Sequence, residues 1–234
     1  MKIGIFTDPH YSSAAVTCKK RFNSASLEKI AEAYRYFAAE GCGPVICLGD
    51  LIDREGDHQK EIQNLTAVSE IIRASGLHTV CVMGNHDAFT FTQDEFYSIT
   101  GALCRPPLRI TSSDGKILLF VNACYYASGE PYAPGKGNWK DTFYPYAEQL
   151  RRELDAAEGD VYIFMHQNID PEIPENHRLS NDAELREILE RSGKVRTVFQ
   201  GHYHKGNECE LNGIRYVTYP AMCEGEGRRY VVEL

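Results

Sequence analysis

The chain has 234 residues, of which 43% are hydrophobic, and this is enough to build the core of one α/β domain spanning residues 1–234. Its 33 acidic residues outnumber its 25 basic ones, which gives a net charge of −8. Because proteins bind long nucleic acids through clustered Lys and Arg, this balance argues against DNA or RNA polymers as partners. A bound divalent cation would offset part of the negative charge.

Eight cysteines are spread along the chain without a C-x-x-C pair, and several of them lie inside apolar runs. Cysteines of this kind behave as small hydrophobic residues, so we expect reduced thiols in a cytoplasmic protein. Only five residues separate Lys2 from Asp8, and no stretch approaches the roughly 18 apolar residues of a membrane span. The sequence therefore predicts neither export nor insertion into a membrane.

Short β-type runs alternate with helical patterns along most of the chain, which predicts largely parallel strand pairing in an α/β architecture. The predicted strands cover residues 2–7, 44–48, 78–83, 116–122, 160–165 and 195–200. The predicted helices cover residues 26–40, 58–75, 144–157 and 182–191.

The C-terminal part of the chain changes character. The pattern there predicts three antiparallel strands, at residues 208–211, 214–219 and 229–233. Asn212-Gly213 is a typical hairpin turn between the first two. We therefore expect a three-stranded β-meander after the α/β part.

Ligand-type residues directly follow five of the predicted strands, in the motifs TDPH, LGDLID, MGNHD, MHQN and GHYHKG. Each motif alone has an ordinary explanation, since Gly-Asp is common in turns and a lone histidine after an apolar strand is more often a core residue. Ligands collect outside the carboxyl ends of strands in open α/β sheets. Five such motifs together therefore indicate one site.

The candidate ligands are two carboxylates, one amide oxygen and four imidazoles: Asp8, His10, Asp50, Asn85, His166, His202 and His204. This set, which has no thiolate, suits Mn, Fe, Co or Zn and contains too much nitrogen for a calcium site. It is too large for one catalytic ion with open positions, but it is enough for two ions that share a carboxylate. In an extended segment His202 and His204 would project from the same face, about 6.5 to 7 Å apart. Two solvated loop histidines are the alternative.

The series D-x-H, G-D, G-N-H-D, H and G-H-x-H, spread over residues 3–204, resembles the calcineurin-like metallophosphoesterases. The spacing and the segment NGIRYVTYPA are most similar to the branch of cyclic-nucleotide and glycerophosphodiester phosphodiesterases. The resemblance implies a four-layer α/β/β/α sandwich with two divalent or mixed-valence ions of Mn, Fe or Zn. It places Asp8, His10 and His204 on the first ion and Asn85, His166 and His202 on the second, with Asp50 bridging.

The resemblance further implies that a metal-bridging hydroxide attacks phosphorus and hydrolyses a phosphoester. His86 would lie beside the metals and stabilise the transition state or protonate the leaving oxygen. Asp87 would orient that ring, unless it is a turn carboxylate that caps the following segment.

We expect the substrate to be a small phosphodiester or a nucleotide pyrophosphate. A phosphomonoesterase or protein phosphatase is the alternative enzyme, and a scaffold that has lost the chemistry is the alternative of a different class. The sequence leaves the substrate, the native metals and the oligomeric state open.

The role of several other residues has two alternative interpretations. Asp53 could bond a ligand histidine or lie on the surface, and His58 is expected to be an ordinary residue near a helix start. Lys19 and Arg21 could contact a second phosphate or face water. The aromatic residues of the long loop could stack on a nucleobase or pack the loop onto the domain: Tyr125, Tyr126, Tyr132 and Trp139.

Overall fold

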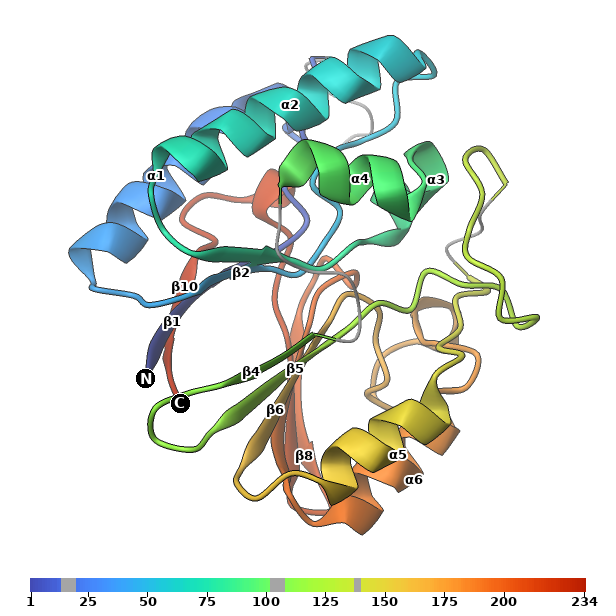
Figure 1. Cartoon of the computed structure of the whole chain (residues 1–234). Helices are drawn as coiled ribbons and strands as arrows, with labels where there is room; N and C mark the ends of the chain where they lie inside the picture. Colours follow the sequence, from blue (N-terminus) through green and yellow to red (C-terminus); the bar gives the residue numbers. More distant parts are fainter. Residues whose placement is uncertain (14–19, 102–107, 137–139) are drawn as a thin grey trace.

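Two β-sheets lie face to face at the centre of the molecule, and helices cover the outer face of each sheet (Figure 1). The computed structural model describes residues 1–13, 20–101, 108–136 and 140–234. The four-layer α/β/β/α sandwich expected from the sequence is confirmed. Among the described residues, no helix combines the length and the apolar character needed to cross a membrane.

The first sheet has the strand order β10-β1-β2-β3, with β1, β2 and β3 parallel. Its strands are Lys2–Phe6 (β1), Val45–Cys47 (β2), Thr79–Cys81 (β3) and Tyr230–Glu233 (β10). Four helices lie on its outer side: Ser26–Ala39 (α1), His58–Ala74 (α2), Asn85–Thr90 (α3) and Gln93–Thr100 (α4).

The second sheet has the strand order β4-β5-β6-β7-β9-β8, with a parallel centre and antiparallel edges. Its strands are Leu108–Thr111 (β4), Ile117–Val121 (β5), Val161–Met165 (β6), Val195–Gln200 (β7), Asn207–Leu211 (β8) and Ile214–Thr218 (β9). Two helices cover its outer side: Ala147–Asp155 (α5) and Asp182–Ser192 (α6).

A stack of phenylalanine rings helps to hold the sheets together. Phe164 on β6 stacks between Phe120 on β5 and Phe199 on β7, with ring centroids 5.1 and 5.0 Å apart. All three rings are buried and belong to the same hydrophobic cluster as Ile5 and Ile46 of the first sheet. Close packing of this kind resists small displacements. It therefore fixes where the strand ends of the two sheets meet.

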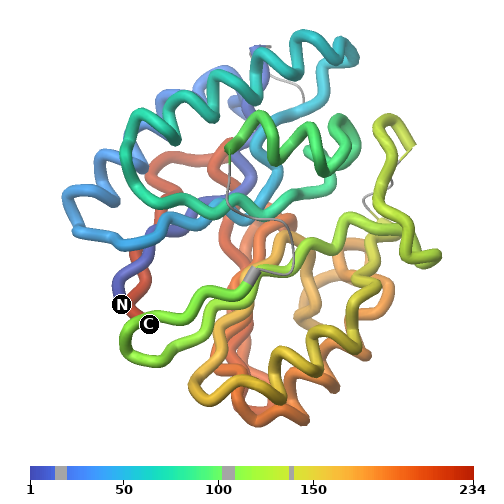
Figure 2. The backbone as a smooth tube through the Cα atoms, viewed as in Figure 1, coloured from blue at the N-terminus to red at the C-terminus, as the bar shows by residue number. Residues whose placement is uncertain are grey.

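The end of the chain differs from the predicted meander. The β8–β9 hairpin is confirmed, and its turn residues Asn212 and Gly213 have positive φ values of 51° and 79°. The last strand does not continue this hairpin but pairs antiparallel with β1 in the other sheet. Figure 2 shows the two termini side by side, where the Met1 nitrogen donates a hydrogen bond of 3.2 Å to the Leu234 carbonyl. An apolar run predicts a strand, but it does not specify which sheet the strand joins.

The segment that crosses between the sheets contains a short 3-10 helix, Met222–Glu224. Its Met222 amide donates to the Thr7 carbonyl at 2.9 Å, which fixes it beside the end of β1. The sequence analysis also missed α3, α4 and β4. Helix α3 begins at Asn85, inside the motif MGNHD, where ligand-type residues conceal a helix start.

Candidate metal centre

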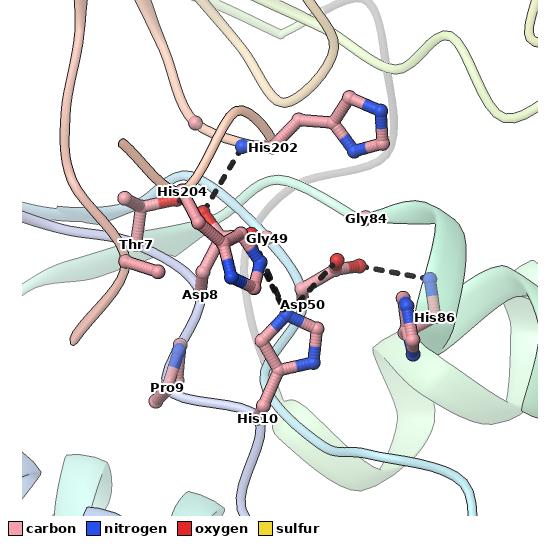
Figure 3. Close-up of polar contacts among 12 residues, drawn as sticks. Thr7, Asp8, Pro9, His10, Gly49, Asp50, Gly84, His86, His202 and His204 are labelled. Atoms are coloured by element: carbon pink, nitrogen blue, oxygen red, sulfur yellow. Dashed lines mark hydrogen bonds and ion pairs between the residues drawn. The ribbon is translucent and has the colours of Figure 1, made fainter. Parts of the chain in front are cut away.

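The five strand-end motifs meet at one edge of the sandwich. Those following β1, β2 and β3 come from the first sheet, and those following β6 and β7 come from the second. Cross-sheet hydrogen bonds join them: the His202 amide donates to Asp8 Oδ2 at 3.0 Å, and His166 Nδ1 donates to the Leu48 carbonyl at 2.7 Å. The convergence expected for the candidate ligands is therefore present, and Figure 3 shows it for Asp8, His10, Asp50, His202 and His204.

Three of the candidate ligands form a first group around Asp8 Oδ1. This oxygen lies 3.6 Å from His10 Nε2 and 3.4 Å from His204 Nε2. The two ring nitrogens lie 3.1 Å from each other. The three donor atoms thus surround a space small enough for one ion.

A second group forms around the fully buried ring of His166. Its Nε2 lies 3.1 Å from Asn85 Oδ1 and 3.3 Å from Asp50 Oδ2. Donor atoms of Asp50, His166 and His202 lie within 4.8 Å of one another. The same Asp50 oxygen is 3.4 Å from His10 Nε2, so it contacts both groups.

Four of the candidate ligands have left-handed backbone conformations, which are uncommon outside glycine. Their φ values are 51° at Asp8, 45° at His10, 54° at Asp50 and 65° at His202. Each such residue costs on the order of 1–3 kcal/mol, and strain of this size concentrates at functional sites. The value at His202 also corrects the expected extended H-x-H segment: the chain turns there, so that the His202 ring faces His166 while His204 faces His10.

The donor chemistry fits transition-metal ions. Asp8 Oδ1 is buried and accepts no hydrogen bond of ordinary geometry from the described residues, although its partner oxygen accepts bonds from Thr7 and His202. His166 and His204 each use Nδ1 to donate a hydrogen bond, to the Leu48 carbonyl and to Glu224 Oε1 (2.6 Å) respectively. With Nδ1 engaged in this way, Nε2 is the ring atom of each residue that faces the centre, and it would coordinate a metal once its proton is released.

Charges in the site shift the pKa values of its groups strongly. Burial would raise the pKa of Asp50, but the rings of His166 and His86 lower it well below its usual range. Burial would lower the pKa of His166, but the carboxylates of Asp50 and Asp8 raise it to about 9. Without a metal, the His166 ring is therefore the proton carrier of the second group.

The ring of His86 is oriented by Asp53. Its Nδ1 lies 2.9 Å from Asp53 Oδ1, and the other oxygen of this carboxylate accepts a hydrogen bond from Arg21 at 2.9 Å. The expected partner Asp87 has a different position: its carboxylate is buried and accepts hydrogen bonds from the Gly84 and Ile52 amides. The capping alternative thus describes the contacts of Asp87, whose pKa burial and Asp50 raise to about 7.

The other sequence candidates lie away from the two groups. His58 begins α2 and contacts Glu95 Oε1 at 3.1 Å on the surface. Tyr125 and Tyr132 are buried, and Tyr126 packs on Tyr132 with ring centroids 4.7 Å apart, so these loop aromatics pack onto the domain. Four residues considered in the sequence analysis lie outside the described residues: Cys18, Lys19, Cys104 and Trp139.

A cavity of about 540 Å³ opens above the two groups, with Asp50, Asn85 and His86 in its wall. Several of its lining residues were not anticipated from the sequence: Lys20, His177, Tyr203, Lys205 and Glu224. Tyr203 and Lys205 lie inside the motif GHYHKG, so the motif itself was a signal that could have identified them. His177 and Glu224 come from distant segments, in the loop after β6 and the crossing after β9, and no local pattern marks them.

The family model for calcineurin-like phosphoesterases matches residues 1–206. The chain belongs to the calcineurin-like phosphoesterase family. Membership makes it a metal-dependent phosphoester hydrolase by class and confirms the family resemblance seen in the motifs. No curated protein matches the chain.

Solved structures show the same calcineurin-like phosphoesterase fold. A dimetal phosphatase from Danio rerio has a TM-score of 0.82 and 16% identity, over 96% of this chain and 88% of that one. The protein TT1561 from Thermus thermophilus has a TM-score of 0.64 and 15% identity, over 96% and 91%. Phosphopantetheinyl hydrolase from Mycobacterium tuberculosis has a TM-score of 0.53 and 12% identity, over 99% and 95%.

Replacing Gly84 with alanine should weaken metal binding by at least about tenfold, as loss of groups that support metal ligands typically does. The backbone there is extended, so alanine meets no conformational penalty, but its Cβ would collide with the Asp50 carboxylate and amide. Gly43→Ala is the matched control, because its Cβ would only approach the Lys2 carbonyl, at 3.6 Å. Metal content per chain after dialysis measures the effect. Full metal content in Gly84→Ala would contradict the packing argument.

Metal loading should tighten as pH rises and should release protons. Below a pKa of about 9, a metal at His166 must displace a proton, so apparent affinity should rise about tenfold per pH unit between pH 6 and 8. Competition with a chelator at several pH values measures the slope. His166→Gln should reduce the slope, whereas His58→Gln should not. An affinity independent of pH in this window would rule out a proton on His166.

Proposed function

We propose that this calcineurin-like phosphoesterase hydrolyses a small phosphodiester or a pyrophosphate-linked nucleotide, using two ions of Mn, Fe or Zn. The observation that carries the proposal is the position of Asp50. One of its oxygens lies 3.4 Å from His10 Nε2 and 3.3 Å from His166 Nε2, so a single carboxylate is shared by two groups of donors. A shared carboxylate is typical of two-metal sites.

In this proposal each group of donors holds one ion. Asp8, His10 and His204 hold the first and Asn85, His166 and His202 hold the second, with Asp50 common to both. When bound, the ions lower the pKa of a water molecule and neutralise charge on the phosphoryl oxygens.

The protein itself supplies the proton for the leaving oxygen from His86. Its ring forms part of the cavity wall, and Asp53 fixes the ring through Nδ1, so Nε2 is the atom left to face the substrate. Burial opposes protonation, but the charges of Asp50 and Asp53 raise the pKa of His86. The ring can therefore carry a proton near neutral pH and act as a general acid.

The size of the cavity is further support for a small substrate. A volume of about 540 Å³ is within the usual range for pockets that bind small molecules. The diester preference rests on the similarity of the spacing and of NGIRYVTYPA to the phosphodiesterase branch. A phosphomonoesterase is the second candidate, because the structure from Danio rerio with a TM-score of 0.82 is described as a dimetal phosphatase.

A paired rate assay tests the proposed function. Protein stripped with a chelator and reloaded with Mn²⁺ should hydrolyse bis(p-nitrophenyl) phosphate with a higher kcat/KM than p-nitrophenyl phosphate. Asp50→Ala should lose both bound metal and activity, because it removes the shared oxygen. A faster monoester reaction would favour the second candidate. If neither ester is hydrolysed by protein with two metals per chain, the proposal fails.

His86→Ala should keep two metals per chain and lower kcat by about 10² to 10⁴, the range typical of a lost general acid. His58→Ala is the matched control and should change nothing, since that ring lies on the surface. In Asp53→Asn, loss of the carboxylate that raises the pKa of His86 should move the alkaline fall of kcat to lower pH. A change in kcat below about threefold for His86→Ala would remove it from this role.

A further inference from the structure

Two lysines on the wall of the cavity, Lys20 and Lys205, form no ion pair among the described residues. The charged groups around them are already engaged. Arg21 is held by Asp53 at 2.9 Å, and Glu224 is held by His204 at 2.6 Å. In a chain with a net charge of −8, acidic partners are abundant, so uncompensated cations at one cavity are informative.

Lys205 shares the cavity wall with a residue from a distant part of the chain. His177 belongs to the short 3-10 helix Glu175–His177, in the loop that follows β6. Its ring centroid lies 5.0 Å from that of Tyr203 and 5.4 Å from that of His202. His177 and Lys205 both line the cavity, beside the candidate metal ligands.

We infer that Lys205 and His177 form a second phosphate subsite next to the metal centre, so that the substrate carries one phosphate besides the phosphoryl group that is cleaved. This inference rests on the proposed function and narrows it to pyrophosphate-linked nucleotides over simple diesters. The Lys205 ammonium supplies the charge, and the His177 ring supplies one N–H donor.

Lys205 and His177 come from a different sheet than His86, and all three residues line the same cavity. His86 and its partner Asp53 come from the first sheet, whereas Lys205 and His177 follow strands β7 and β6 of the second. A substrate with two phosphates can therefore contact both sides of the cavity at once. A diester with one phosphate leaves the Lys205 charge without an anion.

A matched pair of substrates tests the inference: the p-nitrophenyl ester of thymidine 5′-monophosphate, with one phosphate, and that of thymidine 5′-diphosphate, with two. The quantity to measure is the ratio of kcat/KM for the second ester to that for the first, by chromatography at saturating Mn²⁺. Lys205→Gln should lower this ratio by about twofold to fivefold, because Lys205 is exposed and water screens its charge. His177→Gln should lower it in the same direction.

Two further variants separate binding from folding effects. Lys205→Arg keeps the charge and should largely preserve the ratio. Lys136→Gln removes an exposed lysine outside the cavity and should leave both reactions unchanged. If both esters are hydrolysed and Lys205→Gln leaves the ratio as in the wild type, the subsite is overturned while the proposed function stands. If wild-type protein with two metals per chain hydrolyses neither ester, both are overturned.

Discussion

The burial of the Asp50 carboxylate is the constraint on which the rest of the site depends. Its side chain is only 2% exposed, and an ionised carboxylate is costly to bury unless it is paired and hydrogen-bonded. The His86 amide donates to one of its oxygens at 2.8 Å, and the other faces the rings of His10 and His166. Helix α3 must therefore begin where it does, because its first turn supplies the amide that satisfies this oxygen.

Close approach around Asp50 also explains the glycines of the motifs. Gly49 has a φ of 103°, and a Cβ there would lie 2.7 Å from His166 Nδ1. Gly84 leaves no room for a side chain between its own backbone and Asp50. The end of β2 can approach the His166 ring only because Gly49 lacks a side chain, and the end of β3 can approach Asp50 only because Gly84 lacks one. The glycines in G-D and G-N-H-D are thus part of the packing of the site and do not merely permit turns.

The residues in the left-handed conformation show which part of the site depends on the stability of the surrounding sandwich. Strain at Asp8, His10 and Asp50 persists only if the surrounding structure holds each backbone in place. The His10 amide donates to the Asp50 carbonyl at 3.0 Å, and the Cys223 amide donates to the Asp8 carbonyl at 3.1 Å. These bonds tie β1, β2 and the crossing segment to one another. The aromatic stack between the sheets then keeps the strained ends from relaxing apart.

The sequence predicts what depends on short stretches of chain and misses what depends on contacts across the fold. Apolar runs followed by Asp, Asn or His identified the strand ends, because strand and motif are adjacent in the chain. The partner of His86 could not be found in this way: Asp87 is its neighbour in sequence, but Asp53 is its neighbour in space. For the same reason the sequence does not identify Glu224. This residue contacts His204 because β10 pairs with the first sheet, which places the crossing segment beside the site.

These distant partners make the two groups of donors chemically unequal. His204 donates its Nδ1 hydrogen to a carboxylate, Glu224, whereas His166 donates to the backbone carbonyl of Leu48. A carboxylate partner raises the basicity of an imidazole ligand more than a neutral carbonyl does, because it stabilises positive charge on the ring. The first group therefore contains a histidine with a carboxylate partner, whereas the second contains a histidine with a neutral partner and the Asn85 amide oxygen. In the proposed function, an asymmetry of this kind would let one fold hold two ions with different affinities while the Asp50 carboxylate contacts both groups of donors.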